Sequence, residues 1–390
     1  MTLQLATGNL AAGHSMSLAG EANRTARGAV CGIYPITPQT EIVEHVARFP
    51  FSKGRVIPVE SEHSAMGVCI GAALNGARSF TASSSNGLAY MAENVMVAAN
   101  YRLPIVMAAV NRTLGPPWNI WADQGDSLMF RDFAWIQLYC DTNQDVADTS
   151  LLAFRLAEDP RILLPVMICM DAFIVSHTSM EIELATQQQV DKFLPACSIP
   201  HHLDPAHPVT VGGMTMPQET VSHRKELDEA MQRVPAVLDE HRANFATVFG
   251  RSVSGAVSAY RTEDADRILI ASGTIATTLR DKVDEWRERG EKVGMVRIKL
   301  FRPFPVREIL ELCRNAARIG VLDRNYAAGS GGIFWQEVRA ALQGRSDIPV
   351  QGYLVGVGGS DVVPETVEEI VQDLSDREQA SDPVWKGVVQ

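Results

Sequence analysis

The chain has 390 residues, of which 46% are hydrophobic and 21% charged, a composition typical of a globular protein with more than one domain. Its net charge of -11 at pH 7 argues against nucleic acid or an anionic membrane surface as a partner. No apolar run approaches a membrane span, and the N-terminus lacks the basic start of a signal peptide, so a cytoplasmic location is expected.

Short apolar segments alternate with helical stretches over residues 1–180. This alternation predicts an α/β domain with a doubly wound, mainly parallel sheet that helices cover on both faces. The candidate strands are Ala29–Tyr34, Arg55–Val59, Arg78–Ser83, Ile105–Val110, Ile136–Tyr139 and Leu164–Met170. The segment Thr81–Gly87 precedes a helix expected to start near Leu88. It lacks the lysine of a P-loop, so we interpret it as a tight turn beside the active site.

The first informative motif is Tyr34–Thr40, Tyr-Pro-Ile-Thr-Pro-Gln-Thr, directly after the first apolar strand. Each proline fixes its own φ and favours extended geometry in the residue before it. We therefore expect a stiff turn that presents Thr37 beside the N-terminus of the next helix. A hydroxyl group in that position can help to hold a carboxylate.

Two further segments carry polar side chains that can take part in chemistry. Val59–Gly67 enters a helix rich in small residues, with Glu60 or Ser61 as a possible cap and Glu62 in the first turn. Arg112 ends the strand before a loop rich in Pro and Trp. An arginine in such a setting can grip a carboxylate with two parallel hydrogen bonds.

The sequence changes character after residue 180. Residues 181–255 are predicted to form an extended linker that includes Gln187–Gln189, followed by a polar helix, Glu219–Phe249. Residues 256–390 again show strand and helix signals and predict a second α/β domain. Gly329–Gly332 does not indicate NAD, because the glycines follow the wrong element and no acidic ribose partner lies at the expected distance.

The six cysteines are scattered among apolar residues and form no C-x-x-C pair. This spacing predicts buried, reduced thiols and gives no sign of a zinc site or an iron–sulfur cluster. If the protein is a redox enzyme, its electrons therefore leave through another polypeptide.

Taken in order, these motifs resemble the alpha subunit of the 2-oxoacid:ferredoxin (acceptor) oxidoreductases, most closely the pyruvate:ferredoxin oxidoreductase type. The resemblance covers nearly the whole chain. Its segments are YPITPQT at 34–40, ESEHSAMG at 60–67, NR at 111–112 with PPWNIW at 116–121, RDFAWIQLY at 131–139, DAFIVSH at 171–177, KVGMVRIKLFRPFP at 292–305 and GVLDRNYAAGSGGI at 320–333. The resemblance implies a pyrimidine-type thiamine diphosphate domain over 1–180 and a transketolase C-terminal-like domain over 256–390.

The resemblance also implies a reaction and a set of roles. Members of this family decarboxylate a 2-oxoacid with thiamine diphosphate, transfer the acyl group to coenzyme A and pass electrons to iron–sulfur clusters. The carboxyl group that binds the aminopyrimidine maps onto Glu62, with Glu60 as the alternative. Pro35 and Ile36 are expected to contact the cofactor, and Thr37 and Arg112 to hold the substrate carboxylate.

The family's metal motif, Gly-Asp-Gly followed by an asparagine, has no good match, since Gly125-Asp126-Ser127 falls in another loop. No metal ligand is therefore assigned to this chain. A beta subunit is expected to supply Mg²⁺, the diphosphate site and a [4Fe-4S] cluster, with gamma and ferredoxin-like delta subunits completing a hetero-oligomer. Electrons would then reach ferredoxin or an NAD-linked acceptor through those other subunits.

The identity of the substrate is the least determined point. Pyruvate is the first expectation. Pyruvate-type relatives tend to carry alanine or serine just after the arginine, whereas this chain continues from Arg112 with Thr-Leu-Gly-Pro-Pro, residues 113–117. Gly115 could widen the pocket for an aryl 2-oxoacid such as phenylglyoxylate. Equally, it could only relieve backbone strain before the two prolines. A non-redox thiamine-dependent subunit is the other alternative.

Overall fold

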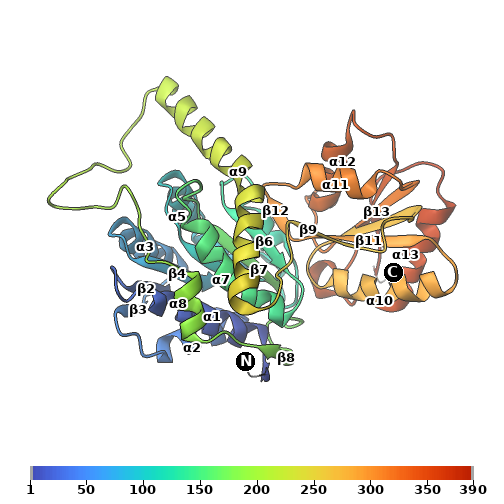
Figure 1. The fold of residues 1–390 in the computed structure, drawn as a ribbon. Coiled ribbons are helices and arrows are strands. Elements are labelled where there is room, and N and C mark those ends of the chain that lie inside the picture. The colour runs from blue at the N-terminus through green and yellow to red at the C-terminus, as the bar shows by residue number, and fades with distance from the viewer. Residues whose placement is uncertain (1–2, 388–390) are drawn as a thin grey trace.

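The strands of the protein form two large sheets in separate halves of the molecule (Figure 1). The structure is a computed structural model that describes residues 3–387. The N-terminal half contains a seven-stranded sheet in the order β12-β6-β7-β5-β4-β2-β3. All of its strands except β12 run parallel, which confirms the predicted doubly wound sheet. They are β2 (Ala29–Ile33), β3 (Gly54–Pro58), β4 (Arg78–Ser83), β5 (Val106–Asn111), β6 (Ile136–Cys140), β7 (Val166–Asp171) and β12 (Leu300–Arg302).

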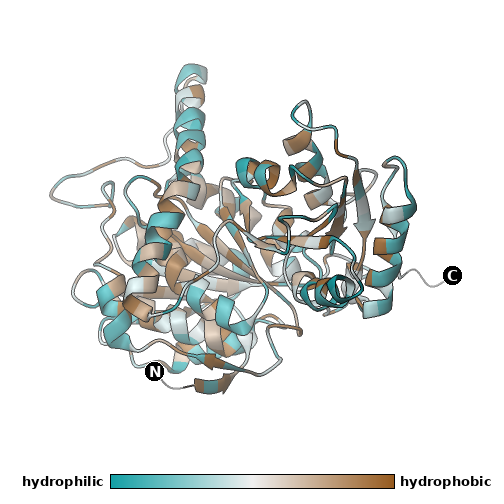
Figure 2. Cartoon of the chain, turned by 45° about the vertical axis from the view of Figure 1, so that its right-hand side comes forward, coloured by the Kyte–Doolittle hydropathy of each residue, from teal (hydrophilic) through white to brown (hydrophobic). Residues whose placement is uncertain are grey.

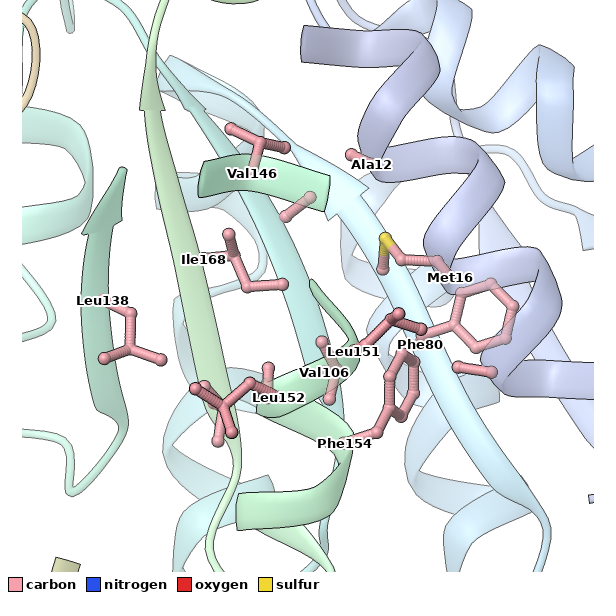
Figure 3. Close-up of a cluster of buried hydrophobic side chains, with 14 of the residues drawn as sticks. Ala12, Met16, Phe80, Val106, Leu138, Val146, Leu151, Leu152, Phe154 and Ile168 are labelled. Atoms are coloured by element: carbon pink, nitrogen blue, oxygen red, sulfur yellow. The ribbon is translucent and has the colours of Figure 1, made fainter. Parts of the chain in front are cut away.

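Helices cover both faces of this sheet, as the side-chain alternation of β5 shows. Val106 and Ala108 lie in the core with α1 and α7, whereas Met107 and Ala109 lie in the core with α3, α4 and α5. Figure 3 shows the first of these cores. The helices are α1 (Gly8–Ala22), α2 (Thr40–Arg48), α3 (Glu62–Leu74), α4 (Ser85–Tyr90), α5 (Ala92–Asn100), α6 (Gly125–Leu128) and α7 (Asn143–Ala157).

Two of these helices begin at residues that matter for the site. Ser61 caps α3, because its hydroxyl accepts the N–H of Ser64 at 3.3 Å, so Glu62 is the first helical residue. The helix after β4 was predicted to start near Leu88 but begins at Ser85. The segment that we expected to form a turn is therefore divided, since Ser83 ends β4, Ser84 is the N-cap and Ser85–Gly87 belong to the first turn of α4.

The segment after residue 180 is only partly extended. β8 (Met180–Glu183) pairs antiparallel with β1 (Leu3–Ala6). The prediction of extended chain at Gln187–Gln189 is wrong, because these residues open α8 (Gln187–Phe193). Its cap, Thr186, and Gln189 form a capping box, and Val190 and Phe193 are buried.

The predicted polar helix is α9 (Pro217–Phe249), which starts two residues before the predicted Glu219. Its outer end is largely hydrophilic and stands away from the body of the molecule (Figures 1 and 2). Its inner end buries Phe245 and Phe249 against Phe193. Within residues 3–387, no helix is both long and apolar enough to cross a membrane.

The C-terminal half contains a six-stranded sheet in the order β15-β14-β13-β10-β11-β9, in which β9 is antiparallel to β11. β12 follows β11 directly in sequence, yet it pairs with β6 of the other sheet. The strands are β9 (Val257–Tyr260), β10 (Arg267–Ala271), β11 (Val293–Ile298), β13 (Arg318–Asp323), β14 (Val350–Leu354) and β15 (Val384–Trp385). The helices are α10 (Ile275–Glu288), α11 (Val306–Cys313), α12 (Ile333–Leu342), α13 (Pro364–Asp376) and the 3₁₀ turn η1 (Val357–Gly359). The domain limits at 180 and 255 remain predictions.

The glycine run Gly329–Gly332 joins β13 to α12. The carboxylate of Asp323 accepts the N–H groups of Phe334 and Trp335 at 2.9 and 3.0 Å. An added Cβ at Gly332 would lie 2.1 Å from Oδ2 of Asp323. The start of α12 is thus capped by a side chain of the protein itself, where a nucleotide-binding turn would offer its N–H groups to phosphate.

A pair of glycine substitutions tests the packing of α3 on the sheet. An added Cβ at Gly32 would lie 2.2 Å from the carbonyl oxygen of Ala65, whereas one at Gly71 would meet nothing within 4 Å. Gly32→Ala should destabilise the protein by about 1–3 kcal/mol, because the backbone of α3 has to shift. Gly71→Ala should stabilise it by about 0.5–1 kcal/mol through helix propensity. Thermal unfolding of the purified variants measures both effects, and equal midpoints would contradict this packing.

Candidate active site

The sequence-predicted site residues lie at the carboxyl ends of the parallel strands, where open α/β sheets bind ligands. The turn Tyr34–Thr40 follows β2, Ser85 follows β4 and Arg112 follows β5. Glu62 opens α3, which packs against β2 and β4. Four separate segments of the chain therefore meet at one edge of the sheet.

The turn after β2 is held from inside, which leaves Thr37 exposed. Gln39 is fully buried, and its side-chain amide donates to the carbonyl of Tyr34 at 2.8 Å. The amide of Asn9 on α1 donates to the carbonyl of Pro38 at 2.7 Å. These two hydrogen bonds hold the turn in place, in line with the stiff turn that we expected from its two prolines.

Arg112 reaches this turn from β5. Its Nη1 donates to the carbonyl oxygen of Thr37, and its guanidinium carbon lies 5.0 Å from the ring centroid of Trp118. The residue is only 6% exposed, and its Nε has no hydrogen-bond partner among the described residues. Burial lowers the pKa of Arg112, and the nearby carboxyl group of Asp126 opposes that shift. Two of the predicted substrate-binding residues are thus in direct contact.

Glu62 is buried and packs so closely against Gly87 of α4 that no side chain fits at position 87. It is 7% exposed, and an added Cβ at Gly87 would lie 2.6 Å from its Oε1 and 2.6 Å from the hydroxyl oxygen of Ser83. The Ser83 hydroxyl is buried and without a hydrogen-bond partner among residues 3–387. A buried carboxyl group and an unpaired hydroxyl therefore both pack against the backbone of Gly87.

The alternative candidate, Glu60, lies in a different environment. It is exposed and accepts the hydroxyl of Ser64, and this hydrogen bond lowers the pKa of Glu60. A carboxylate that is exposed and ionised suits surface capping rather than a dry binding site. Burial therefore favours Glu62 over Glu60.

Gly115 has a conformational reason to be glycine. Its φ is +78°, a region that L-residues rarely adopt, and its N–H donates to the Asn86 side chain at 3.0 Å. An added Cβ would meet nothing within 4 Å. Of the two sequence interpretations, backbone strain accounts for this glycine without a bulky substrate.

Sequence reasoning missed Asp126, which was considered only as a poor match to a metal motif. Its buried carboxyl group accepts the backbone N–H groups of Ser85 and Arg112 at 2.8 and 3.0 Å through Oδ2. Oδ1 accepts the Asn111 side chain at 2.7 Å and the Ser127 N–H at 2.8 Å. Burial raises the pKa of Asp126 to about 7, although these N–H groups partly lower it. The segment Asp123-Gln124-Gly125-Asp126-Ser127 carries several polar residues, so nothing in the sequence distinguished this carboxylate from its neighbours.

The C-terminal half closes one side of the site. A cavity of about 500 Å³ lies between the loop after Arg112 and the loops of the second sheet, with Trp118 and Asp123 on one wall and Tyr326 and Gly358 on the other. The N–H of Gly358 donates to Asp123 at 2.9 Å. The loop that follows Arg112 is therefore supported by both halves.

The segment DAFIVSH at 171–177 also joins the two halves. Asp171 accepts the N–H and the hydroxyl of Thr274 at 2.9 and 2.6 Å. The ring of Phe173 lies 4.9 Å from that of Trp121. His177 lies 3.2 Å from Glu41 in the first turn of α2. This segment, recognised only as a motif in the sequence, supports the loop after Arg112.

Comparison with known proteins identifies the family. Residues 21–243 match the family model described as pyruvate flavodoxin/ferredoxin oxidoreductase, thiamine diphosphate-binding, and residues 265–367 match pyruvate:ferredoxin oxidoreductase core domain II. The pyruvate synthase subunit PorA of Methanothermobacter thermautotrophicus is 42% identical, over 94% of this chain and 95% of its own length. The ketoisovalerate oxidoreductase subunit VorA of Pyrococcus horikoshii is 41% identical, over 90% and 89%.

Two solved structures share the fold. A 2-oxoglutarate:ferredoxin oxidoreductase from Magnetococcus marinus, with 2-oxoglutarate, coenzyme A and succinyl-CoA bound, superimposes with a TM-score of 0.73 at 19% identity. That match covers 95% of this chain and 65% of the longer neighbour. An inactive split-gene transketolase tetramer gives a TM-score of 0.54 at 14% identity, over 93% of this chain and 92% of its own.

The fold, the site and these matches define an oxidoreductase subunit with a thiamine diphosphate-binding domain. The chain belongs to the 2-oxoacid:ferredoxin oxidoreductase family, as an alpha subunit of the pyruvate type. Its multi-subunit enzyme carries out the CoA-acylating oxidative decarboxylation of a 2-oxoacid. The family and the reaction predicted from the sequence are confirmed.

Gly87→Ala tests whether the close packing of Gly87 against the Glu62 side chain is needed for this activity. The new methyl group would crowd the carboxyl group of Glu62, so dye reduction by the assembled complex should fall by about 10- to 100-fold. Gly67→Ala is the matched control, because an added Cβ there meets only the Asn94 amide at 3.6 Å. Equal losses in both variants would show that general packing, and not the crowding of Glu62, is responsible.

Proposed function

We propose that this chain supplies two parts of the active site, a carboxyl group for the aminopyrimidine of thiamine diphosphate and a binding site for the carboxylate of the 2-oxoacid. Glu62 provides the first part, and Arg112 with Thr37 provides the second. When bound, the cofactor supplies a carbon nucleophile and an electron sink. The residues of this chain orient the two molecules and exclude water from them.

One observation carries this proposal, which is that Arg112 is a buried cation without an anionic partner. Other buried arginines form ion pairs, as Arg78 does with Glu158 at 2.6 Å and Arg297 with Asp141 at 3.0 Å. Arg112 has no such pair among the described residues, and its guanidinium hydrogen-bonds only to the neutral carbonyl of Thr37. Because a buried charge is costly unless it is paired, a bound carboxylate would supply what the free chain lacks.

The surroundings of Glu62 fit the cofactor role. The side chain is buried, it approaches Gly87 more closely than any residue with a Cβ would allow, and the buried Ser83 hydroxyl, which also packs against Gly87, has no partner among residues 3–387. A heteroaromatic ring with a polar edge would supply a hydrogen-bonding partner for the buried carboxyl group. Glu62 then holds a proton at the ring nitrogen. Pro35 and Ile36, in the turn after β2, stay predicted cofactor contacts.

The other half of the site is proposed to come from a partner. Thr37, Pro35 and Trp118 are exposed in this chain, although substrate-binding groups work best away from water. The cysteines at positions 31, 69, 140, 169, 197 and 313 are all buried and free. We therefore assign Mg²⁺, the diphosphate site and a [4Fe-4S] cluster to a beta subunit, and transfer to ferredoxin or an NAD-linked acceptor to gamma and delta subunits.

Pyruvate is the proposed substrate. The relatives include pyruvate synthase and ketoisovalerate oxidoreductase subunits at 42% and 41% identity, so overall identity does not separate these two acids. The case for phenylglyoxylate rested on Gly115. The positive φ of Gly115 already accounts for a glycine at that position, so a bulky substrate is not needed to explain it. A non-redox thiamine enzyme also loses its support, because the relatives that match along the chain are oxidoreductase subunits.

The experiment that tests the substrate uses the native complex, isolated through a tag on this chain. Viologen reduction is measured with pyruvate, ketoisovalerate and phenylglyoxylate, each with and without coenzyme A. We expect CoA-dependent reduction with the highest kcat/KM for pyruvate. A higher kcat/KM for either other acid would replace pyruvate, and a complex without cluster iron would contradict the assigned partners.

Glu62→Gln tests the cofactor role. The amide cannot hold the proton that the carboxyl group shares with the ring nitrogen, so kcat should fall by about 100- to 10,000-fold. Glu60→Gln is the control and should keep nearly full activity, because Glu60 is exposed. Gel filtration should show normal assembly for both variants. If Glu60→Gln loses activity while Glu62→Gln keeps it, the role moves to Glu60.

A further inference from the structure

Four consecutive residues at the start of α4 contact the parts of the site that lie on other segments. The Ser84 hydroxyl donates to the carbonyl of Val110 at 2.6 Å, and the Ser85 hydroxyl donates to the carbonyl of Thr113. The side chain of Asn86 accepts the N–H of Gly115, and Gly87 adjoins Glu62. The start of α4 therefore determines how far the cofactor side of the site lies from the substrate side.

The backbone at Ser85 adopts a conformation that needs hydrogen bonds from other segments to stabilise it. Ser85 has a φ of +49°, which is strained for a residue other than glycine. The capping residue, Ser84, makes no side-chain hydrogen bond to α4, since its hydroxyl is used on β5. The N–H of Ser85 would be left without an acceptor if Asp126 did not supply one at 2.8 Å.

The same oxygen of Asp126 also accepts the N–H of Arg112 at 3.0 Å. One buried atom, Oδ2, thus connects the first residue of α4 to the residue that carries the guanidinium. Oδ1 is fixed in turn by the Asn111 side chain and by the N–H of Ser127. All four partners are donors, so the carboxylate has no freedom to turn away from the two backbone N–H groups.

The support extends to the C-terminal half through the residues before Asp126. The N–H of Gln124 donates to the carbonyl of Arg324 at 3.0 Å, and Asp123 accepts the N–H of Gly358 at 2.9 Å. Both contacts anchor the start of α6, the short helix that carries Asp126. The position of Asp126 is therefore set by both halves of the molecule.

We propose that Asp126 is a positioning residue, whose buried carboxylate fixes the backbone of Arg112 relative to the start of α4 and so keeps the substrate-binding guanidinium at one distance from Glu62. This rests on the roles proposed above for Arg112 and Glu62. Asp126 touches neither substrate nor cofactor. It acts through the two backbone N–H groups that share Oδ2.

Asp126→Ala tests the proposal, because it removes both acceptors. The KM for the 2-oxoacid should rise about tenfold or more, since the two backbone N–H groups lose their common partner. Asp126→Asn should raise KM by clearly less than Asp126→Ala, because its carbonyl oxygen can replace Oδ2 as the acceptor for both backbone N–H groups, although its amide then faces two donors, the Asn111 side chain and the Ser127 N–H. Loss of activity in Asp126→Asn equal to that in Asp126→Ala would overturn the proposal.

Asp159→Ala is the matched control. Asp159 is another buried carboxyl group that accepts a backbone N–H, that of Arg161 at 2.9 Å, but in the loop after α7. Asp159→Ala should lower the unfolding temperature and leave the KM of the assembled complex unchanged. A rise in KM equal to that of Asp126→Ala would show a general structural effect and overturn the positioning role.

A double-mutant cycle with Arg112→Ala separates this inference from the proposed function. If Asp126 acts through Arg112, adding Asp126→Ala to Arg112→Ala should change KM by less than about twofold. If Arg112→Ala raises KM and Asp126→Ala does not, only the positioning inference fails. If Arg112→Ala leaves KM unchanged, the proposed substrate site fails, and this inference fails with it.

Hydrogen exchange provides a readout that does not depend on turnover. Peptides that contain Ser85 and Arg112 should exchange faster in Asp126→Ala than in wild type, and near the wild-type rate in Asp126→Asn. If Asp126→Ala does not assemble, Asn111→Ala replaces it, since it removes one of the groups that orient the carboxylate. A KM rise of about threefold that disappears in the Arg112→Ala background would support the proposal, and an unchanged KM would overturn it.

Discussion

The site depends on keeping a buried cation, Arg112, without an ion-pair partner. The protein achieves this with backbone contacts rather than with a salt bridge, since the guanidinium donates to the carbonyl of Thr37 and lies over the ring of Trp118. The nearby carboxyl group of Asp126 is used by four N–H donors. The positive charge is therefore only partly compensated, and a substrate carboxylate that bound there as proposed would meet a cation that is already buried.

This arrangement explains why the stiff turn and the parallel sheet both matter. Parallel strands end at the same edge, so β2 and β5 deliver Thr37 and Arg112 to one place without a long loop. Hydrogen bonds from Gln39 and Asn9 hold the turn from inside, where they do not compete with a ligand. Pre-organisation of this kind lowers the entropy lost on binding.

Much of this could be predicted from the sequence, because the relevant signals are local. Apolar segments of strand length predicted the sheet and the two prolines predicted the turn at Thr37, whereas the role of Glu62 came from the family resemblance. The structure adds the burial that separates Glu62 from Glu60. The helix at Gln187 was missed because a capping box with Thr186 outweighs a polar run that looks like a loop.

The contributions of Gly87 and Asp126 could not be predicted, because each depends on residues distant in sequence. Gly87 matters because it lets Glu62 approach the backbone of α4, whereas Gly115 is glycine because its φ is +78°. A sequence shows the same residue in both cases. Asp126 looks like the remnant of a metal motif until the fold brings Ser85 to within 2.8 Å of it. If the proposed roles hold, the recognisable side chains bind the ligands, and less conspicuous residues set the distances between them.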